Sequence, residues 1–180
     1  MEKHKLIKEI LFTRQELEDK IKILADWVND TYKNSNELII VGIMKGAMPF
    51  MMQLIKDVKI DCILDFLTVS SYYGGTKSSG NSKIILDMAQ DIEGKDVLVV
   101  EEIIDSGISL KRVRDLLLSR KPRSFKILTL LDKQANRKEN IYPDATGFVI
   151  PDHFVVGFGL DYQEKLRNLP YIGIFDKTKI

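Results

Sequence analysis

Three runs of mostly apolar residues constrain the fold of this chain more than any other feature of its sequence. They are ELIIVGI at residues 37–43, VLVV at 97–100 and FKILTLL at 125–131. A strand that is apolar at successive positions buries both of its faces, which is typical of parallel sheets covered by helices. Because segments with helical periodicity alternate with these strands and crossovers are right-handed, we predict an α/β fold with a mainly parallel, twisted sheet flanked by helices.

The other predicted elements complete one domain. Thr13 and Glu16 have the spacing of a capping box, at the start of a helix that extends to Tyr32. Residues 70–82, rich in serine and glycine, predict a mobile loop. We expect a single domain over residues 1–180, with a core at about 35–145 and a small hood from the N-terminal segment and about 146–180. Further helices are predicted at 49–56 and 109–120, and further strands at 60–69, 147–150, 154–157 and 171–175.

Composition and charge exclude several classes of protein. The 180 residues include 27 Lys and Arg against 26 Asp and Glu, and 44% are hydrophobic. This balance excludes a disordered chain and leaves no global positive field for nucleic acid. The single cysteine, Cys62, lies in an apolar stretch, which predicts a buried thiol in a reducing cytoplasm.

The apolar segment 38–55 does not predict a membrane span. Lys45 near its centre would cost about 2.5–3.5 kcal/mol in a bilayer, and Gly46 and Pro49 interrupt a helix there. The N-terminus lacks the apolar core of a signal peptide. We therefore expect a soluble, cytoplasmic protein without a membrane or nucleic-acid partner.

The segment VLVVEEIIDSGISL, residues 97–110, carries the clearest chemistry. A buried strand runs into small hydroxyl residues and a glycine where a helix begins, and such a turn cradles phosphate with backbone N–H groups. Three carboxylates, Glu101, Glu102 and Asp105, would repel a phosphate unless a divalent cation, sugar hydroxyls or a proton transfer requires them. From spacing alone, an acidic surface loop after a strand explains the segment equally well.

This segment resembles the ribose-phosphate-binding motif of type I phosphoribosyltransferases, and the resemblance extends over nearly the whole chain. VGIMKGAMPFM is similar to the family's pyrophosphate loop, TVSSYYGGTKSSG to its mobile loop, and LLDK with IPDHFVVGFGLDYQEKLRNLPYIG to its base-binding hood. The last stretch resembles the members that use hypoxanthine and guanine. The resemblance implies a type I phosphoribosyltransferase fold and purine salvage: Mg²⁺-dependent transfer of the 5-phosphoribosyl group from phosphoribosyl pyrophosphate to N9 of hypoxanthine or guanine, giving IMP or GMP and pyrophosphate.

The resemblance also assigns residues to the sugar and the phosphates. Asp105 matches the catalytic acid or base beside purine N7, which takes a proton as N9 attacks. Glu101 and Glu102 match the pair that binds the ribose hydroxyls and Mg²⁺. The family usually has Glu-Asp, so the longer Glu102 leaves open whether the contact is direct or through water. The implied 5′-phosphate cradle is Asp105, Ser106, Gly107, Ile108 and Ser109, and the implied pyrophosphate site is Lys45, Gly46 and Arg167.

The implied base site lies in the C-terminal part of the chain. Lys133 matches the lysine that donates to the purine 6-oxo group, which disfavours adenine. Phe154 matches the aromatic ring that stacks on the purine, and Val155 contributes backbone groups near position 2. Asp161, at the same site, matches an acid that reaches a second Mg²⁺ through water.

Loop closure is implied for Ser71 and Tyr72, which match the dipeptide that folds over the reacting centre. Simpler interpretations exist for single residues: Asp105 as a helix cap, Phe154 as core and Arg167 as a solvated surface arginine. For the whole chain, the alternatives are a phosphoribosyltransferase that prefers another base such as xanthine, an RNA-binding regulator with this fold, and an α/β domain without such activity. The implied partners are phosphoribosyl pyrophosphate, 6-oxopurine bases and further copies of the chain in a homodimer or homotetramer.

Overall fold

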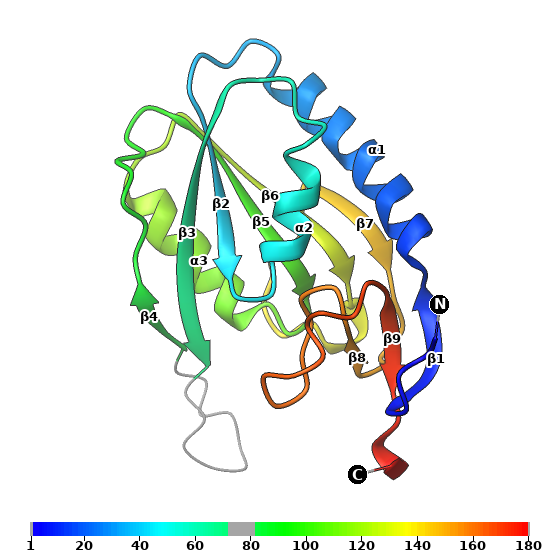
Figure 1. Cartoon of the computed structure of the whole chain (residues 1–180). Coiled ribbons are helices and arrows are strands. Elements are labelled where there is room, and N and C mark those ends of the chain that lie inside the picture. The colour runs from blue at the N-terminus through cyan, green and yellow to red at the C-terminus, as the bar shows by residue number, and fades with distance from the viewer. Residues whose placement is uncertain (1, 72–81, 180) are drawn as a thin grey trace.

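The computed structural model describes residues 2–71 and 82–179, and a six-stranded sheet lies at its centre (Figure 1). The strand order is β4-β3-β2-β5-β6-β7, in which β4 is antiparallel to β3 and the other neighbours are parallel. The prediction of a mainly parallel sheet is therefore confirmed. The strands are β2 (Leu38–Met44), β3 (Cys62–Ser71), β4 (Ser82–Leu86), β5 (Asp96–Ile104), β6 (Ser124–Asp132) and β7 (Ala145–Val149).

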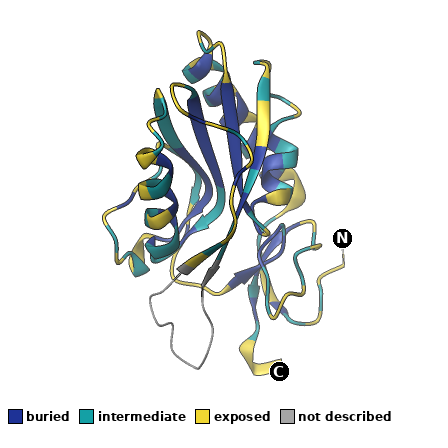
Figure 2. Ribbon diagram, turned by 90° about the vertical axis from the view of Figure 1, so that its left-hand side faces the viewer, coloured by how far each residue is buried: buried dark blue, intermediate teal, exposed yellow. Residues whose placement is uncertain are grey.

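Helices cover both faces of this sheet. α1 (Arg14–Tyr32) and α2 (Met48–Leu54) pack on one face, and α3 (Ile108–Ser119) packs on the other. The side chains of β2 alternate between the two cores: Leu38 and Ile40 contact the cluster of α1 and α2, whereas Ile39 and Val41 contact that of α3. Figure 2 shows the buried strands between helices with exposed outer surfaces. Both faces of the strand are covered, which is why its sequence is apolar throughout.

The start of α1 confirms the predicted capping box. The hydroxyl oxygen of Thr13 accepts a hydrogen bond from the N–H of Glu16 at 3.3 Å, and the N–H of Thr13 donates to the Glu16 carboxylate at 2.8 Å. Two otherwise unpaired backbone donors are thereby satisfied. The cap therefore determines where α1 begins.

A smaller antiparallel sheet, here called the hood sheet, lies near the carboxyl ends of the parallel strands (Figure 1). It consists of β1 (Ile7–Phe12), β9 (Ile172–Phe175) and β8 (Val155–Val156), in that order. Its own apolar cluster comprises Ile7, Val156, Tyr171 and Phe175. Strands from the two ends of the chain thus pair beyond the carboxyl ends of the central strands, which is the side of the sheet where ligands bind in this architecture.

The structure differs from the sequence-based predictions at several boundaries. The sequence did not predict β1 or β4. β1 depends on pairing with the distant β9, and β4 is a short edge strand in which Ile85 and Leu86 are exposed. β5 continues past Val100 to Ile104, so both glutamates lie on the strand. Of the predicted loop at 70–82, residues 72–81 lie outside the described residues.

The central sheet includes part of the C-terminal segment of the chain. β7 pairs with β6 as far as Val149, so the central sheet extends to that residue. The ring of Phe148 in β7 stacks on that of Phe12 in β1 at a centroid distance of 4.0 Å. α1 packs on the same sheet, so only β1 from the N-terminal segment joins the hood sheet. No helix in the two described ranges has the length and apolar character that crossing a membrane requires.

Candidate active site

The carboxyl ends of β2 and β5 border a cavity of about 230 Å³. Its walls include the end of β2 and the segment that joins β5 to α3, so strand ends and a helix start meet at one place. Most of the residues predicted to bind ribose 5-phosphate line this cavity, and Ile108 begins α3 beside them. The lining residues among them are Glu101, Glu102, Asp105, Ser106, Gly107 and Ser109.

Gly107 gives the turn between β5 and α3 its shape. Its φ of +80° lies in the left-handed region, and a Cβ atom there would lie 2.7 Å from Cγ2 of Ile141. It is the N-cap of α3, without a side chain that could pair with the first N–H groups. Ser106 Oγ accepts from the N–H of Ile108 at 3.5 Å. A phosphate at this helix start would meet backbone donors and two serine hydroxyls.

Asp105 is held by Lys133 instead of capping the helix. The ammonium nitrogen of Lys133 lies 3.0 Å from Oδ2 of Asp105 and 3.2 Å from Oδ1 of Asp152, and Lys133 is only 7% exposed. The other oxygen of Asp105 is buried and has no hydrogen-bond partner among the described residues. Lys133 and Asn136 lower the pKa of Asp152 by hydrogen bonding to its carboxylate. The structure therefore brings together the predicted proton acceptor and the predicted purine-binding lysine.

Glu101 and Glu102 form a shielded acidic pair at the end of β5. Burial raises the pKa of both carboxyl groups, and their mutual charge raises that of Glu101 further. One carboxylate oxygen of Glu102 is buried without a partner among the described residues. A Cβ atom at Gly46 would overlap the Glu102 carboxylate, so the glycine allows the loop after β2 to approach. The peptide bond before Lys45 in that loop is cis.

The two cations predicted for pyrophosphate, Lys45 and Arg167, contact the same carboxylate. Nη2 of Arg167 is 2.8 Å from Asp161 and 3.3 Å from Glu164, and Nη1 donates to the carbonyl of Gly159 at 2.7 Å. Nζ of Lys45 is 2.6 Å from the second oxygen of Glu164. Glu164 thus bridges the two cations, and Lys45 together with Arg167 lowers the pKa of its carboxyl group. These contacts exclude the interpretation of Arg167 as a merely solvated arginine.

Phe154 is 41% exposed, so it is not a core residue. Its ring makes T-shaped contacts with those of Phe175 and Tyr162, at centroid distances of 5.6 and 6.2 Å. Lys133, which pairs with Asp105, also donates to the carbonyl of the preceding residue, His153, at 3.4 Å. Val155 follows in β8 with a buried side chain.

Comparison with known proteins agrees with this geometry. The family model of the phosphoribosyl transferase domain matches residues 8–163. The chain is 49% identical to the hypoxanthine-guanine phosphoribosyltransferase of Lactococcus lactis, with 94% of this chain and 92% of that protein covered. The chain belongs to the hypoxanthine-guanine phosphoribosyltransferase family.

Two further proteins resemble this chain over nearly its whole length. The bifunctional protein TilS/HprT of Listeria monocytogenes is 50% identical over 95% of this chain, and the chain spans 26% of that longer protein. The hypoxanthine phosphoribosyltransferase of Trypanosoma cruzi, solved in complex with the product IMP, is 31% identical. It superposes with a TM-score of 0.92 over the full length of both chains. The type I phosphoribosyltransferase fold is thereby confirmed.

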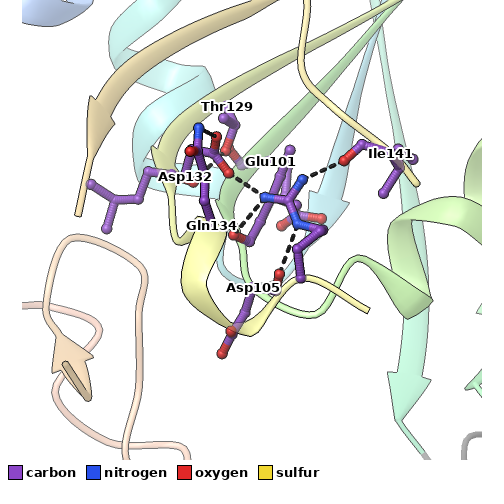
Figure 3. A network of polar contacts seen from close by, with 9 residues as sticks. Glu101, Asp105, Thr129, Asp132, Gln134 and Ile141 are labelled. Atoms are coloured by element: carbon purple, nitrogen blue, oxygen red, sulfur yellow. Dashed lines mark hydrogen bonds and ion pairs between the residues drawn. The ribbon is translucent and has the colours of Figure 1, made fainter. Parts of the chain in front are cut away.

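Sequence reasoning missed Arg137, which supports the turn between β5 and α3. Its guanidinium pairs with the carboxylate of Asp132 and donates to the carbonyls of Asp105, Ile104 and Ile141. Figure 3 shows Asp105, Asp132 and Ile141 around this network. Asp132 and Ile141 are close to Arg137 in the sequence, but the carbonyls of Ile104 and Asp105 lie more than 30 positions away, so the loop between β6 and β7 gives no local signal for a contact with them.

Glu164 and Asp152 were missed for the same reason, although both lie in stretches that resemble the family's hood. Ser71 ends β3, and Tyr72 lies outside the described residues, so their predicted part in loop closure stays a prediction. No cluster of three or more histidine, cysteine or acidic side chains in the described ranges is arranged as a metal site. The predicted metal residues Glu102 and Asp161 both lie near Arg167.

Proposed function

We propose that this chain transfers the 5-phosphoribosyl group of phosphoribosyl pyrophosphate to N9 of hypoxanthine or guanine, in the purine salvage of the cytoplasm. The observation that carries the proposal is the 3.0 Å pair of Asp105 and Lys133 between the phosphate loop and the hood. In a 6-oxopurine, O6 and N7 lie side by side on one edge of the ring. A neighbouring ammonium and carboxylate complement that edge, because one donates to O6 and the other accepts from N7.

The proposed reaction forms the N9–C1′ bond and breaks the bond from C1′ to pyrophosphate. The base loses a proton, which Asp105 accepts at its unpartnered carboxylate oxygen. Positive charge develops on the ribose ring, next to Glu101 and Glu102. The turn from Asp105 to Ser109 holds the 5′-phosphate, and Lys45, Gly46 and Arg167 bind the pyrophosphate group. Return of the proton from Asp105 serves the reverse reaction.

The acidic residues fit Mg²⁺ carried by the substrate. This ion commonly binds one or two carboxylates together with substrate phosphate oxygens, and Glu102 offers a buried oxygen without a partner among the described residues. We assign Glu101 and Glu102 to this ion and the ribose hydroxyls, and Asp161 to a second ion. When bound, Mg²⁺ neutralises charge on the departing pyrophosphate.

We assign the purine base to Lys133 and to the hood residues Phe154 and Val155. Lys133 donates to the 6-oxo group, and adenine offers a donor amino group at the same position, so adenine is disfavoured. The exposed ring of Phe154 stacks on the purine, and the backbone of Val155 contacts the ring near position 2. Because guanine and xanthine differ there, a preference for xanthine is the nearest alternative.

The proposal extends to partners and loop closure. Ser71 and Tyr72 close over the reacting centre and exclude water. The chain forms a homodimer or homotetramer and binds neither membranes nor nucleic acid. Sedimentation of the purified protein at micromolar concentration measures its oligomeric state. A single monomeric species would overturn the proposed homodimer or homotetramer.

The decisive assay offers hypoxanthine, guanine, xanthine and adenine separately, with phosphoribosyl pyrophosphate and Mg²⁺. We expect nucleotide formation with hypoxanthine or guanine, loss of that activity with EDTA, and little turnover of adenine. Fastest turnover of xanthine would correct the base assignment. No turnover with any base by folded protein would overturn the proposal, and RNA binding with a steep salt dependence would then favour the regulator.

A further inference from the structure

A tight hairpin turn in the hood presents Glu164 in an unusual backbone conformation. Tyr162 and Lys165 exchange two backbone hydrogen bonds of 3.0 Å, and the two residues between them, Gln163 and Glu164, have φ angles of +51° and +64°. Turns of this kind favour asparagine and glycine, since a side chain with a Cβ atom is disfavoured in the left-handed region. Glutamate at this position is therefore explained by its carboxylate and not by the turn.

The carboxylate of Glu164 spans two cations from distant segments. One oxygen lies 2.6 Å from Nζ of Lys45, in the loop after β2, and the other lies 3.3 Å from Nη2 of Arg167, in the hood. The N–H of Glu164 donates to Asp161 at 2.9 Å, which fixes the turn beside the same arginine. A carboxylate with an oxygen on each cation has the contacts that an incoming phosphate group would make.

The contacts of Glu164 can be exchanged. The side chains of Lys45 and Glu164 are 61% and 64% exposed, so water screens their attraction and the pair is weak. A pyrophosphate group has several negative oxygens and attracts both cations more strongly than one carboxylate does. It also repels a carboxylate at the same place, so the two anions exclude each other.

We infer that Glu164 is a placeholder anion: its carboxylate occupies Lys45 and Arg167 in the free protein, and pyrophosphate binding displaces it. The inference rests on the proposed function, because that proposal assigns these two cations to pyrophosphate. Glu164 holds the cations close together before substrate arrives. It also weakens pyrophosphate binding, and thereby favours release of this product.

The test is calorimetric titration of the full chain with pyrophosphate in the presence of Mg²⁺. We expect Glu164→Gln to bind pyrophosphate about two- to ten-fold more tightly than wild type, the range for losing an exposed ion pair and a like charge. Glu164→Asn, which suits the left-handed turn, should give the same direction. Glu93→Gln is the matched control, because Glu93 is exposed, pairs with Lys121 at 3.9 Å and lies outside the site. The Glu93→Gln variant should bind pyrophosphate with the same affinity as wild type.

Lys45→Met tests the proposed pyrophosphate site separately from the placeholder role of Glu164. If it weakens pyrophosphate binding, the proposed site stands; the gain from Glu164→Gln should then be smaller in the Lys45→Met background, since one contact of Glu164 is already lost. Unchanged or weaker binding by Glu164→Gln would overturn the placeholder role alone. No binding by wild type, or no effect of Lys45→Met, would overturn both the pyrophosphate site and the inference.

Discussion

Replacing Arg137 with methionine should destabilise the protein severely. The substitution leaves the carboxylate of Asp132, whose side chain is only 3% exposed, without its cation. It also removes the donor to the carbonyl of Asp105 at 3.0 Å and that to Ile141. Breaking a buried ion pair on one side costs roughly 3–5 kcal/mol. Gln134 still donates to Asp132 at 2.9 Å, so we expect a loss in the free energy of unfolding of about 3 kcal/mol.

Urea denaturation, followed by circular dichroism, measures this loss, and a fall in Tm of roughly 6–12 °C should accompany it. Adding Asp132→Asn should recover part of the stability, because the double variant contains no unpaired buried charge. Arg114→Met is the control: Arg114 pairs with Asp115 at the surface of α3, and its loss should cost less than about 1 kcal/mol. A loss below about 1 kcal/mol for Arg137→Met would refute the reasoning.

Three further predictions concern single groups. Asp105→Asn should lower turnover by about 10²–10⁴-fold while the fold is kept, because the amide cannot accept the proton; equal turnover by this variant and the exposed control Asp115→Asn would contradict the assignment. Arg123 holds the pKa of Asp96 below its usual value. Below about pH 4 the unfolded chain therefore binds a proton at this carboxylate, whereas the folded protein keeps it ionised. Stability should therefore fall as the pH drops from about 5 to 3, and less steeply in Asp96→Asn; parallel profiles would disprove this linkage. Burial raises the pKa of the Cys62 thiol, so a disulfide reagent at pH 7.5 should modify it more slowly in native than in unfolded protein, and equal rates would contradict this expectation.

Local sequence determined the framework of the fold. Apolar residues on both faces of β2, β5 and β6 require cover on each side, and this requirement predicts a parallel sheet between helices. Thr13 and Glu16 determine the start of α1 within four residues. The types and order of residues from Glu101 to Ser109 predicted a turn with backbone donors between a strand end and a helix start, and residues of this segment line the cavity at the end of β5.

Tertiary structure decided which side chains work together. The pair of Asp105 and Lys133 joins segments that lie 28 positions apart, and the contact of Lys45 with Glu164 joins segments 119 positions apart. Neither contact follows from the spacing of its own residues. Arg137 resembles any loop arginine until the chain folds and encloses it with Asp132 and the carbonyl of Asp105. Hydrophobic periodicity and capping act over a few residues, whereas a buried charge takes its partners from whichever segments the fold packs around it.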